Sequence, residues 1–193
     1  MSLLTEEQIK KIGLKFAGKN VKISNKASIW NAANISVGDN SRIDDFCVLS
    51  AGEGGIEIGK NVHVAVYSSL IGKGKITLED FSNISSRISI YSSNDNYSGE
   101  YMTNPTIDEK FTDVTHGPVT VKRHAIIGAG SIILPNVTLG IGSCVGALSL
   151  IKDNCEDFGI YAGSPAKYIK QRSNKLLELE KDFTKWTLLR QSI

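Results

Sequence analysis

The sequence has 193 residues, of which 41% are hydrophobic and 22% are charged, with a net charge of +2 at neutral pH. These values are ordinary for one folded domain and give no argument for binding nucleic acid or an anionic membrane surface. No apolar run approaches the roughly 18 residues of a membrane span, and the N-terminus lacks the pattern of a signal peptide. The three cysteines, Cys47, Cys144 and Cys155, form no CxxC pair. They fit reduced thiols in a cytoplasmic protein better than disulfides or a zinc site.

The first segment, residues 1–20, is expected to form a helical cap. Residues 5–8 read TEEQ, which is typical of a helix capping box at Thr5. The helix is expected to continue through about Phe16. It would cover the open end of the repeat that follows.

From residue 21 to residue 172 the chain is dominated by a six-residue repeat. A spacing of six fits neither the helical period of 3.6 nor the strand period of 2. The repeat predicts an all-β solenoid in which each hexad forms one strand and one corner, and three hexads close one coil of a triangular prism. The aliphatic side chains expected to point inward are Val37, Ile43, Leu49, Ile58, Val64, Leu70, Leu78, Ile84, Ile90, Val121, Ile127, Ile133, Leu139, Val145 and Ile151. The small residues expected beside the corners are Ser41, Cys47, Ser68, Ser82, Ala125, Ser131, Ser143 and Ser149.

The hexad count is interrupted at three places. Three residues are added around AGEGG (51–55), two at GKGK (72–75), and 25 between Ile90 and Val121. Insertions in a solenoid leave at a corner and are often functional, so a long inserted loop is expected at about 91–120. Ile23, Ile29 and Ile35 are six apart but out of phase with Val37. The first coil is therefore expected to be irregular.

The last segment, residues 173–193, is expected to form a helix capped by Ser173 or Asn174. Its apolar residues recur at helical spacing and form one stripe. The stripe consists of Leu176, Leu179, Phe183 and Trp186. Packing against the chain's own β-helix and packing against a neighbouring subunit both remain open.

Two stretches carry a family resemblance. VKRHAIIGAGSIILPNVTLGIGSCVGALSLI (121–151) and IYAGSPAKYIKQR (160–172) resemble the hexapeptide-repeat acyltransferases, with the likeness extending over about residues 35–172. Members of that family have a left-handed parallel β-helix, form trimers with active sites between subunits, and use a coenzyme A thioester as acyl donor. The resemblance implies a homotrimer that binds acetyl-CoA or another acyl-CoA. The residues that it places against the donor are Gly128, Ala129, Gly146, Ala147, Ser164, Lys167, Lys170 and Arg172. The three basic residues are expected at the nucleotide phosphates; the alternative is a solvated basic end.

The inserted loop carries a second resemblance. SSNDNYSGEYMTNPT (92–106) is similar to the loop of a subgroup that acylates nucleotide-linked amino-deoxy sugars for bacterial surface polysaccharides such as O-antigen. The resemblance implies Asp95 as the base and Glu100 as a sugar contact, with thymidine as the nucleotide. Ser85 or Ser86 would supply a hydroxyl group. The subgroup often has two adjacent acids at this place, whereas here Asn96 follows Asp95.

The chemistry agrees with an N-acyltransferase. An amino sugar is largely protonated near neutral pH, and a carboxylate within about 3 Å can accept the proton that the amine loses when it attacks a thioester. The main alternative is an O-acetyltransferase in which His116 deprotonates a sugar hydroxyl. His124 is expected to line a cleft between subunits and contact substrate, and His63 to lie at the surface.

Two further classes remain open. One is a zinc enzyme resembling the β-helical carbonic anhydrases, although the spacing of the three histidines does not match that ligand set, so no metal is expected. The other is a solenoid without activity, which predicts no coenzyme A binding. The acyl group, the sugar and the position of its amino group are not determined by the sequence.

Overall fold

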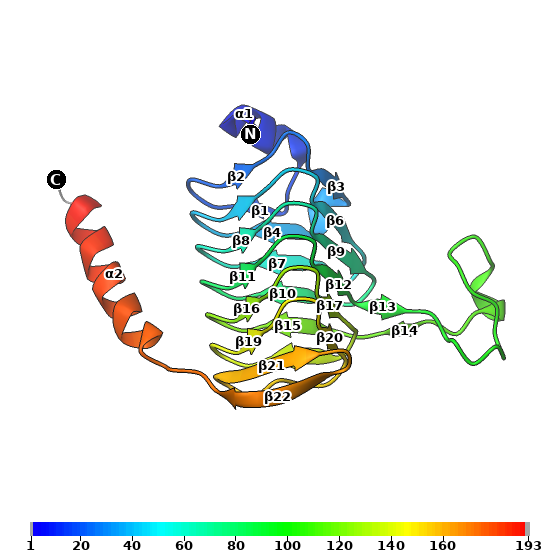
Figure 1. Cartoon of the computed structure of the whole chain (residues 1–193). Helices are drawn as coiled ribbons and strands as arrows, with labels where there is room; N and C mark the ends of the chain where they lie inside the picture. The colour runs from blue at the N-terminus through cyan, green and yellow to red at the C-terminus, as the bar shows by residue number, and fades with distance from the viewer. Residues whose placement is uncertain (1, 192–193) are drawn as a thin grey trace.

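The computed structural model describes residues 2–191. It shows a stack of coils with three faces, each of which is a β-sheet of mainly parallel strands (Figure 1). The three sheets contain six, eight and six strands, and a separate two-stranded sheet lies in the inserted loop. A short helix covers the first coil, a long helix lies beside the stack, and the loop projects from the opposite side (Figure 1). The predicted all-β solenoid is confirmed.

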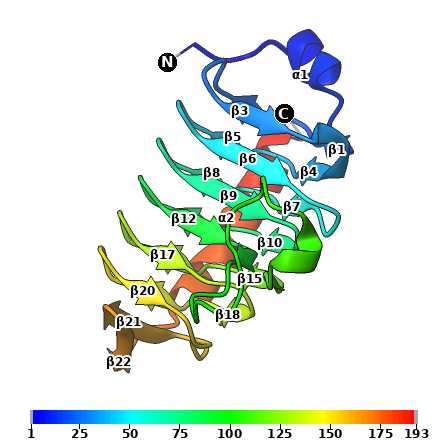
Figure 2. The same cartoon turned by 90° about the vertical axis from the view of Figure 1, so that its right-hand side faces the viewer.

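The strands follow the hexads in chain order. The first sheet consists of β1 (Phe16–Ala17), β4 (Ile35–Val37), β7 (Ile56–Ile58), β10 (Ile76–Leu78), β15 (Val119–Val121) and β18 (Val137–Leu139). The second consists of β2 (Lys22–Ile23), β5 (Arg42–Ile43), β8 (His63–Val64), β11 (Asn83–Ile84), β16 (Ile126–Ile127), β19 (Cys144–Val145), β21 (Gly159–Gly163) and β22 (Ala166–Gln171). The third consists of β3 (Ser28–Trp30), β6 (Val48–Ala51), β9 (Ser69–Gly72), β12 (Ser89–Tyr91), β17 (Ile132–Ile133) and β20 (Leu150–Ile151), one under another in Figure 2.

The hexad aliphatics form one continuous core. All fifteen predicted inward residues are at most 4% exposed, and all eight predicted small residues are buried as well. The registers place equivalent positions directly above one another, as for Val64, Ile84 and Ile127 on the second sheet. Each coil therefore buries its aliphatic residues against the same positions of the next coil, which is how a solenoid gains its hydrophobic stabilisation.

The first coil is regular, so the expectation that it is irregular was wrong. Ala17, Ile23 and Ile29 pair in register with the inward positions of the second coil. The phase changes only afterwards, because a single 3₁₀ turn, Ala32–Asn34, adds residues at the corner before β4. Ile35 is buried, but it belongs to the start of the next coil rather than to the count of the first.

All insertions leave at one corner, between the third and first sheets, which we call the loop corner. The inserted segments of neighbouring coils bond to each other: the Gly52 N–H donates to the Gly72 carbonyl at 3.0 Å, and the Gly54 N–H donates to the Lys73 carbonyl at 2.9 Å. The long loop, residues 92–118, leaves at the same corner one coil further on. The smaller insertions thus form a platform above the loop.

The N-terminal helix α1 (Glu6–Ile12) begins at the predicted capping box, in which Thr5 and Gln8 bond each other's backbone N–H. It does not reach Phe16. Gly13 adopts a left-handed conformation with φ of 78° and ends the helix, as glycine commonly does, and Phe16 already belongs to β1. Ile9 points into the core and closes the end of the prism.

The C-terminal helix α2 (Leu176–Gln191) contacts the stack at the corner between the first and second sheets, which we call the helix corner. Glu180 bonds Arg123 at 3.2 Å and His124 at 2.8 Å, and Phe183 packs edge-on against Phe81. Most of its apolar stripe nevertheless stays exposed: Leu176 is partly buried, whereas Leu179, Phe183 and Trp186 are 66%, 43% and 51% exposed. Among the described residues, no helix is long and apolar enough to span a membrane.

Two adjacent isoleucines of β17 test the register. Ile133 is fully buried, whereas Ile132 points outward and is 40% exposed. Ile133→Ala is expected to lower the free energy of unfolding by about 2–5 kcal/mol because it leaves a cavity. Ile132→Ala, the matched control, is expected to cost less than about 1 kcal/mol. Urea denaturation of both variants measures the difference, and equal losses would contradict the inward assignment.

Candidate active site

The structure gathers most of the residues predicted to contact the acyl donor at the corner between the second and third sheets. Ser85, Gly128 and Gly146 each follow a strand, and Ala162 lies within β21; because these strands are paired in register, the four residues lie one below another. Successive N–H groups donate down the stack: Ser85 to the carbonyl of Ile127 at 3.1 Å, Gly128 to that of Val145 at 2.8 Å, and Gly146 to that of Tyr161 at 2.8 Å. We call this corner, formed by Ser85–Ser86, Gly128–Ala129 and Gly146–Ala147, the Gly–Ala column.

Close packing explains the glycines of this column. A Cβ on Gly128 would lie 2.5 Å from the backbone nitrogen of Ala147, and a Cβ on Gly146 would lie 2.9 Å from the Cβ of Ala162. Buried serines fix the carbonyls: the Ser131 hydroxyl donates to Gly128 O at 2.8 Å, and the Ser149 hydroxyl donates to Gly146 O at 2.8 Å. The column is therefore rigid as well as narrow.

The column also offers hydrogen-bond donors. Among the hydrogen bonds within residues 2–191, none uses the backbone N–H of Ala129 or of Ala147, and both residues are exposed. Fixed backbone N–H groups at a surface corner suit the carbonyl oxygens of an extended ligand or the oxyanion of a tetrahedral intermediate.

The predicted basic residues divide between two places. Lys167 and Lys170 are exposed on β22, where they pair with Ala162 and Ile160 below the column, and Ser164 lies in the turn before that strand. Arg172 lies at the far end of β22. Its guanidinium donates to the carbonyls of Gly142 at 2.8 Å and His124 at 3.2 Å, so it caps the helix corner and does not face the column.

His124 is also held at the helix corner. Its ring stacks on Phe81 with centroids 5.0 Å apart, and Nε2 bonds Glu180 of α2, leaving 12% of the side chain exposed. The structure places this histidine in neither the Gly–Ala column nor the loop.

His63 lies on the outer side of the second sheet, and its Nε2 is 2.9 Å from Asp44 Oδ2. Burial raises the pKa of the Asp44 carboxyl, but hydrogen bonds from His63 and Arg42 outweigh burial and leave that pKa below its ordinary value. His63 therefore serves as a hydrogen-bond partner of Asp44 at the surface.

The inserted loop folds over a cavity of about 740 Å³. Its stem is a short antiparallel ladder of β13 (Ser93–Asn94) with β14 (Thr115–His116), and a 3₁₀ turn, Glu109–Phe111, lies in its outer part. Asp95 and His116 both line the cavity, whereas Glu100 is exposed and is not among the lining residues. The structure thus brings the two competing bases to one place.

Side chains in the stem fix the orientation of His116. Its Nδ1 lies 2.8 Å from the Ser93 hydroxyl, and that hydroxyl accepts the backbone N–H of Lys73 at 2.8 Å. Asp113, which also lines the cavity, accepts a hydrogen bond from Asn96 at 2.7 Å. Neither Ser93 nor Asp113 was expected from the sequence, because each depends on which residues face each other across the loop.

The loop cavity and the Gly–Ala column lie at different corners of the chain. Strand β12 of the third sheet separates Ser85–Ser86 from the start of the loop, and the loop points away from the prism (Figures 1 and 2). One copy of the chain therefore does not bring Asp95 to the donor residues.

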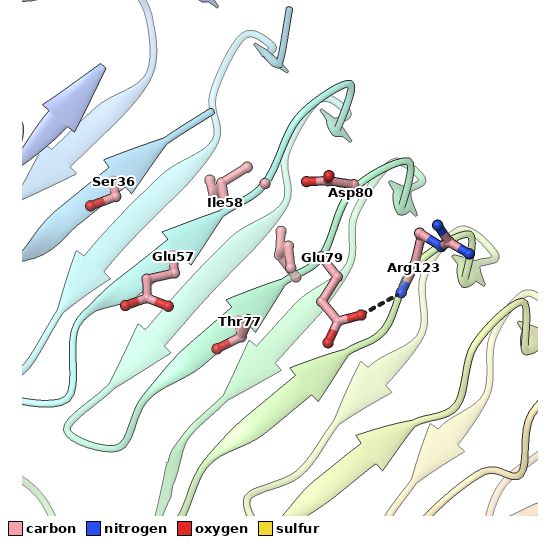
Figure 3. A pocket seen from close by; sticks show the side chains of 9 residues that line it. Ser36, Glu57, Ile58, Thr77, Glu79, Asp80 and Arg123 are labelled. Atoms are coloured by element: carbon pink, nitrogen blue, oxygen red, sulfur yellow. Dashed lines mark hydrogen bonds between the residues drawn. The ribbon is translucent and has the colours of Figure 1, made fainter. Parts of the chain in front are cut away.

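A separate groove of about 490 Å³ runs over the first sheet, and none of the residues predicted for catalysis or for substrate or donor binding lines it. Glu57 and Thr77 point outward from its strands, and Glu79 Oε2 accepts the N–H of Arg123 at 2.9 Å (Figure 3). Three acids, Glu57, Glu79 and Asp80, outnumber the one cation, Arg123, among the residues that line this groove, so its lining is mainly acidic.

The chemistry of the cysteines excludes two of them as nucleophiles. Burial raises the pKa of the Cys155 thiol to about 12 and also raises the pKa of the Cys47 thiol. A thiol that stays protonated near neutral pH does not take up an acyl group. Within residues 2–191, no group of three or more His, Cys, Asp or Glu side chains is arranged to hold a metal ion.

Comparison with known proteins supports an acyltransferase. The chain is 57% identical over 183 residues to the dTDP-4-amino-4,6-dideoxy-D-glucose acyltransferase of Escherichia coli, covering 95% of both chains. It superposes on AntD, an N-acyltransferase from Bacillus cereus, solved with dTDP-4-amino-4,6-dideoxyglucose and coenzyme A, with a TM-score of 0.92 and 47% identity, covering 95% of this chain and 97% of that one. A hexapeptide-repeat acetyltransferase from Vibrio cholerae shares the fold, with a TM-score of 0.61 and 15% identity over 87% of this chain and 76% of that one. No model of a protein family matches the chain.

The repeat, the fold and the relatives define one class. The protein belongs to the hexapeptide-repeat acyltransferases.

The cysteines give a test of whether the acyl group passes directly from donor to acceptor, without first being attached to a cysteine. At pH 8, iodoacetamide is expected to alkylate native protein at Cys144, which is half-exposed, and to leave Cys47 and Cys155 unlabelled. Cys144→Ala is expected to abolish labelling and to keep full acyl transfer. Mass spectrometry of peptides and an assay of coenzyme A release check both results. Labelling of Cys155 in the native protein would contradict its burial, and an inactive but folded Cys144→Ala would contradict transfer without a cysteine intermediate.

Proposed function

We propose that this protein transfers an acyl group from acyl-CoA to the 4-amino group of dTDP-4-amino-4,6-dideoxyglucose, as a step in making a surface polysaccharide. The relative at 57% identity bears the name of that activity, and AntD is solved with that sugar nucleotide and with coenzyme A. The observation that carries the proposal is the cavity of the inserted loop, which Asp95 and His116 line together. The free thiols suit action in the cytoplasm.

Asp95 is assigned as the base. The amino group of the sugar must lose a proton to attack a thioester, and a carboxylate can orient the ammonium group and then accept that proton. The inserted loop brings this predicted acid to a cavity large enough for a sugar. Solved AntD variants include replacements of one aspartate and of one serine, the residue types of Asp95 and Ser85.

The Gly–Ala column is assigned to the acyl donor. Its unpaired N–H groups at Ala129 and Ala147 can bond the amide oxygens of the pantetheine arm. Lys167 and Lys170 follow below the column and can meet the phosphates. AntD was also solved with 3-hydroxybutyryl-CoA. The acyl group that this protein transfers is therefore proposed to be acetyl or a short acyl group of that kind.

The active protein is proposed to be a homotrimer with sites between subunits. A trimer can place the loop of one chain against the Gly–Ala column of the next, which a single chain does not do. The exposed apolar residues of α2, Leu179 at 66% and Trp186 at 51%, are available for packing on a neighbour. Ser85, Ser86 and Glu100 are retained as sugar contacts in this arrangement.

Light scattering is expected to give three times the chain mass of 20.9 kDa; a monomer that transfers acyl groups at the full rate would contradict the trimer.

A second candidate function has one observation in its favour. Because Ser93 holds the ring of His116 in the same cavity, a hydroxyl acceptor there would meet an oriented imidazole. The protein would then be an O-acetyltransferase on a sugar hydroxyl. We rank it below N-acyl transfer because the relatives act on, or bind, an amino sugar.

Paired substitutions separate the two functions. Asp95→Asn is expected to lower kcat for the amino sugar by about 10²–10⁴-fold, since it removes the proton acceptor. His116→Ala is expected to lower kcat less than about tenfold. The assay measures coenzyme A release with dTDP-4-amino-4,6-dideoxyglucose and with its 4-hydroxy analogue as acceptors.

Asp108→Asn is the matched control. Asp108 lies in the same loop outside the cavity lining, and its Oδ1 accepts the N–H of Lys110, a bond that an amide oxygen preserves. This variant is expected to keep full activity. If His116→Ala abolishes turnover while Asp95→Asn retains it, or only the hydroxyl analogue is consumed, N-acyl transfer is wrong.

A further inference from the structure

Asp95 is enclosed by two contacts that cross the inserted loop. On its N-terminal side, Asn94 pairs with Thr115 as the last rung of the β13–β14 ladder. On its C-terminal side, the Asn96 side chain donates from Nδ2 to Asp113 Oδ2 at 2.7 Å. Asp95 is therefore the single residue between two crossings, and its backbone is constrained on both sides.

Asn96 uses both ends of its amide. Its Oδ1 accepts the backbone N–H of Ser98 at 2.8 Å while its Nδ2 donates to Asp113. A carboxylate at this position would keep the first contact but not the second. It would instead place a negative oxygen near the carboxylate of Asp113, where like charges repel. The amide at residue 96 and the acid at residue 113 thus depend on each other.

The contact has no competing partner in the structure. Within the described residues, the Asp113 carboxylate has no salt bridge, and Asn96 Nδ2 has no second acceptor. A hydrogen bond to a charged acceptor is also stronger than one between neutral groups. The pair therefore joins the two sides of the loop at this point without help from another side chain.

We propose that Asn96 and Asp113 form a clamp that positions the carboxylate of Asp95 in the loop cavity. The inference rests on the proposed function, in which Asp95 accepts the proton of the amine. Both residues are positioning residues: they act by fixing the backbone on either side of the base. Small displacements of a catalytic group lower the rate strongly even where binding persists, so the clamp acts on kcat more than on the KM for acyl-CoA.

Exchanging the two side chains tests the clamp. Asn96→Asp is expected to lower kcat for the amino sugar by about 10-fold to 100-fold, with the KM for acyl-CoA within about twofold of the parent. The double variant Asn96→Asp, Asp113→Asn restores a carboxylate–amide pair with the donor on the other strand. It is expected to return kcat to within about threefold of the parent protein.

The matched control is Thr103→Asp, which adds the same charge to the same loop. Thr103 is exposed, does not line the cavity, and has no side-chain hydrogen bond among residues 2–191. This variant is expected to keep full activity, so a general effect of negative charge on the loop is excluded. Parent-like kcat in Asn96→Asp, or a double variant as slow as the single one, would overturn the clamp.

Hydrogen–deuterium exchange provides a readout that does not depend on acyl-transfer activity. Residues 94–98 and 112–115 are expected to exchange faster in Asn96→Asp than in the parent, and to regain protection in the double variant. If Asp95→Asn retains full transfer while these exchange rates follow the prediction, the assignment of the base fails and the clamp stands. If exchange is unchanged in Asn96→Asp, the clamp is wrong whatever the activity.

Discussion

The hydrogen bonding of each coil to the next is the interaction on which the rest of the structure depends. A hexad cannot satisfy its own backbone groups, because a strand of two or three residues followed by a corner has no internal partner. The ladders of the three sheets supply partners in register, from Ile23 with Ile43 down to Val145 with Tyr161. Once the register is set, every hexad position repeats directly above its equivalent. The core follows from this register, because aliphatic side chains then stack on aliphatic side chains.

The same register converts a corner into a column. A feature that recurs at one corner, such as the glycines at residues 128 and 146, becomes a continuous narrow surface along the prism. The buried hydroxyls of Ser131 and Ser149 bond the carbonyls of that surface. The backbone N–H groups of Ala129 and Ala147, next to those carbonyls, have no hydrogen-bond partner within the described chain. An extended ligand needs such a rigid strip with donors at a fixed spacing. The proposed binding site of the acyl donor thus depends mainly on regular structure.

The sequence predicted the regular part well and the irregular part poorly, for a physical reason. Period and register are local properties, so the inward residues from Val37 to Ile151 could be read directly, and each of them is buried. The first coil was missed because one extra turn at residues 32–34 shifts the phase, and a phase shift resembles a loss of pattern. Partners across the loop, such as Ser93 with His116 and Asn96 with Asp113, are seventeen or more residues apart and follow no period. Glu100 lies outside the cavity lining, and its proposed contact with the sugar requires the loop to meet a neighbouring subunit.

The proposed base lies on an insertion, and this placement solves a geometric problem of the prism. A coil exposes its inward positions to nothing but the core, and its outward positions form nearly flat faces, so regular hexads cannot enclose an acceptor. An insertion at a corner can, provided that it keeps a defined shape without the ladder that orders everything else. The described loop obtains that order from the short β13–β14 ladder, from Lys73 of the stacked corner above it, and from the Asn96–Asp113 contact. Each of these contacts adjoins Asp95 or His116, so the order of the loop is concentrated around the two residues proposed as the base.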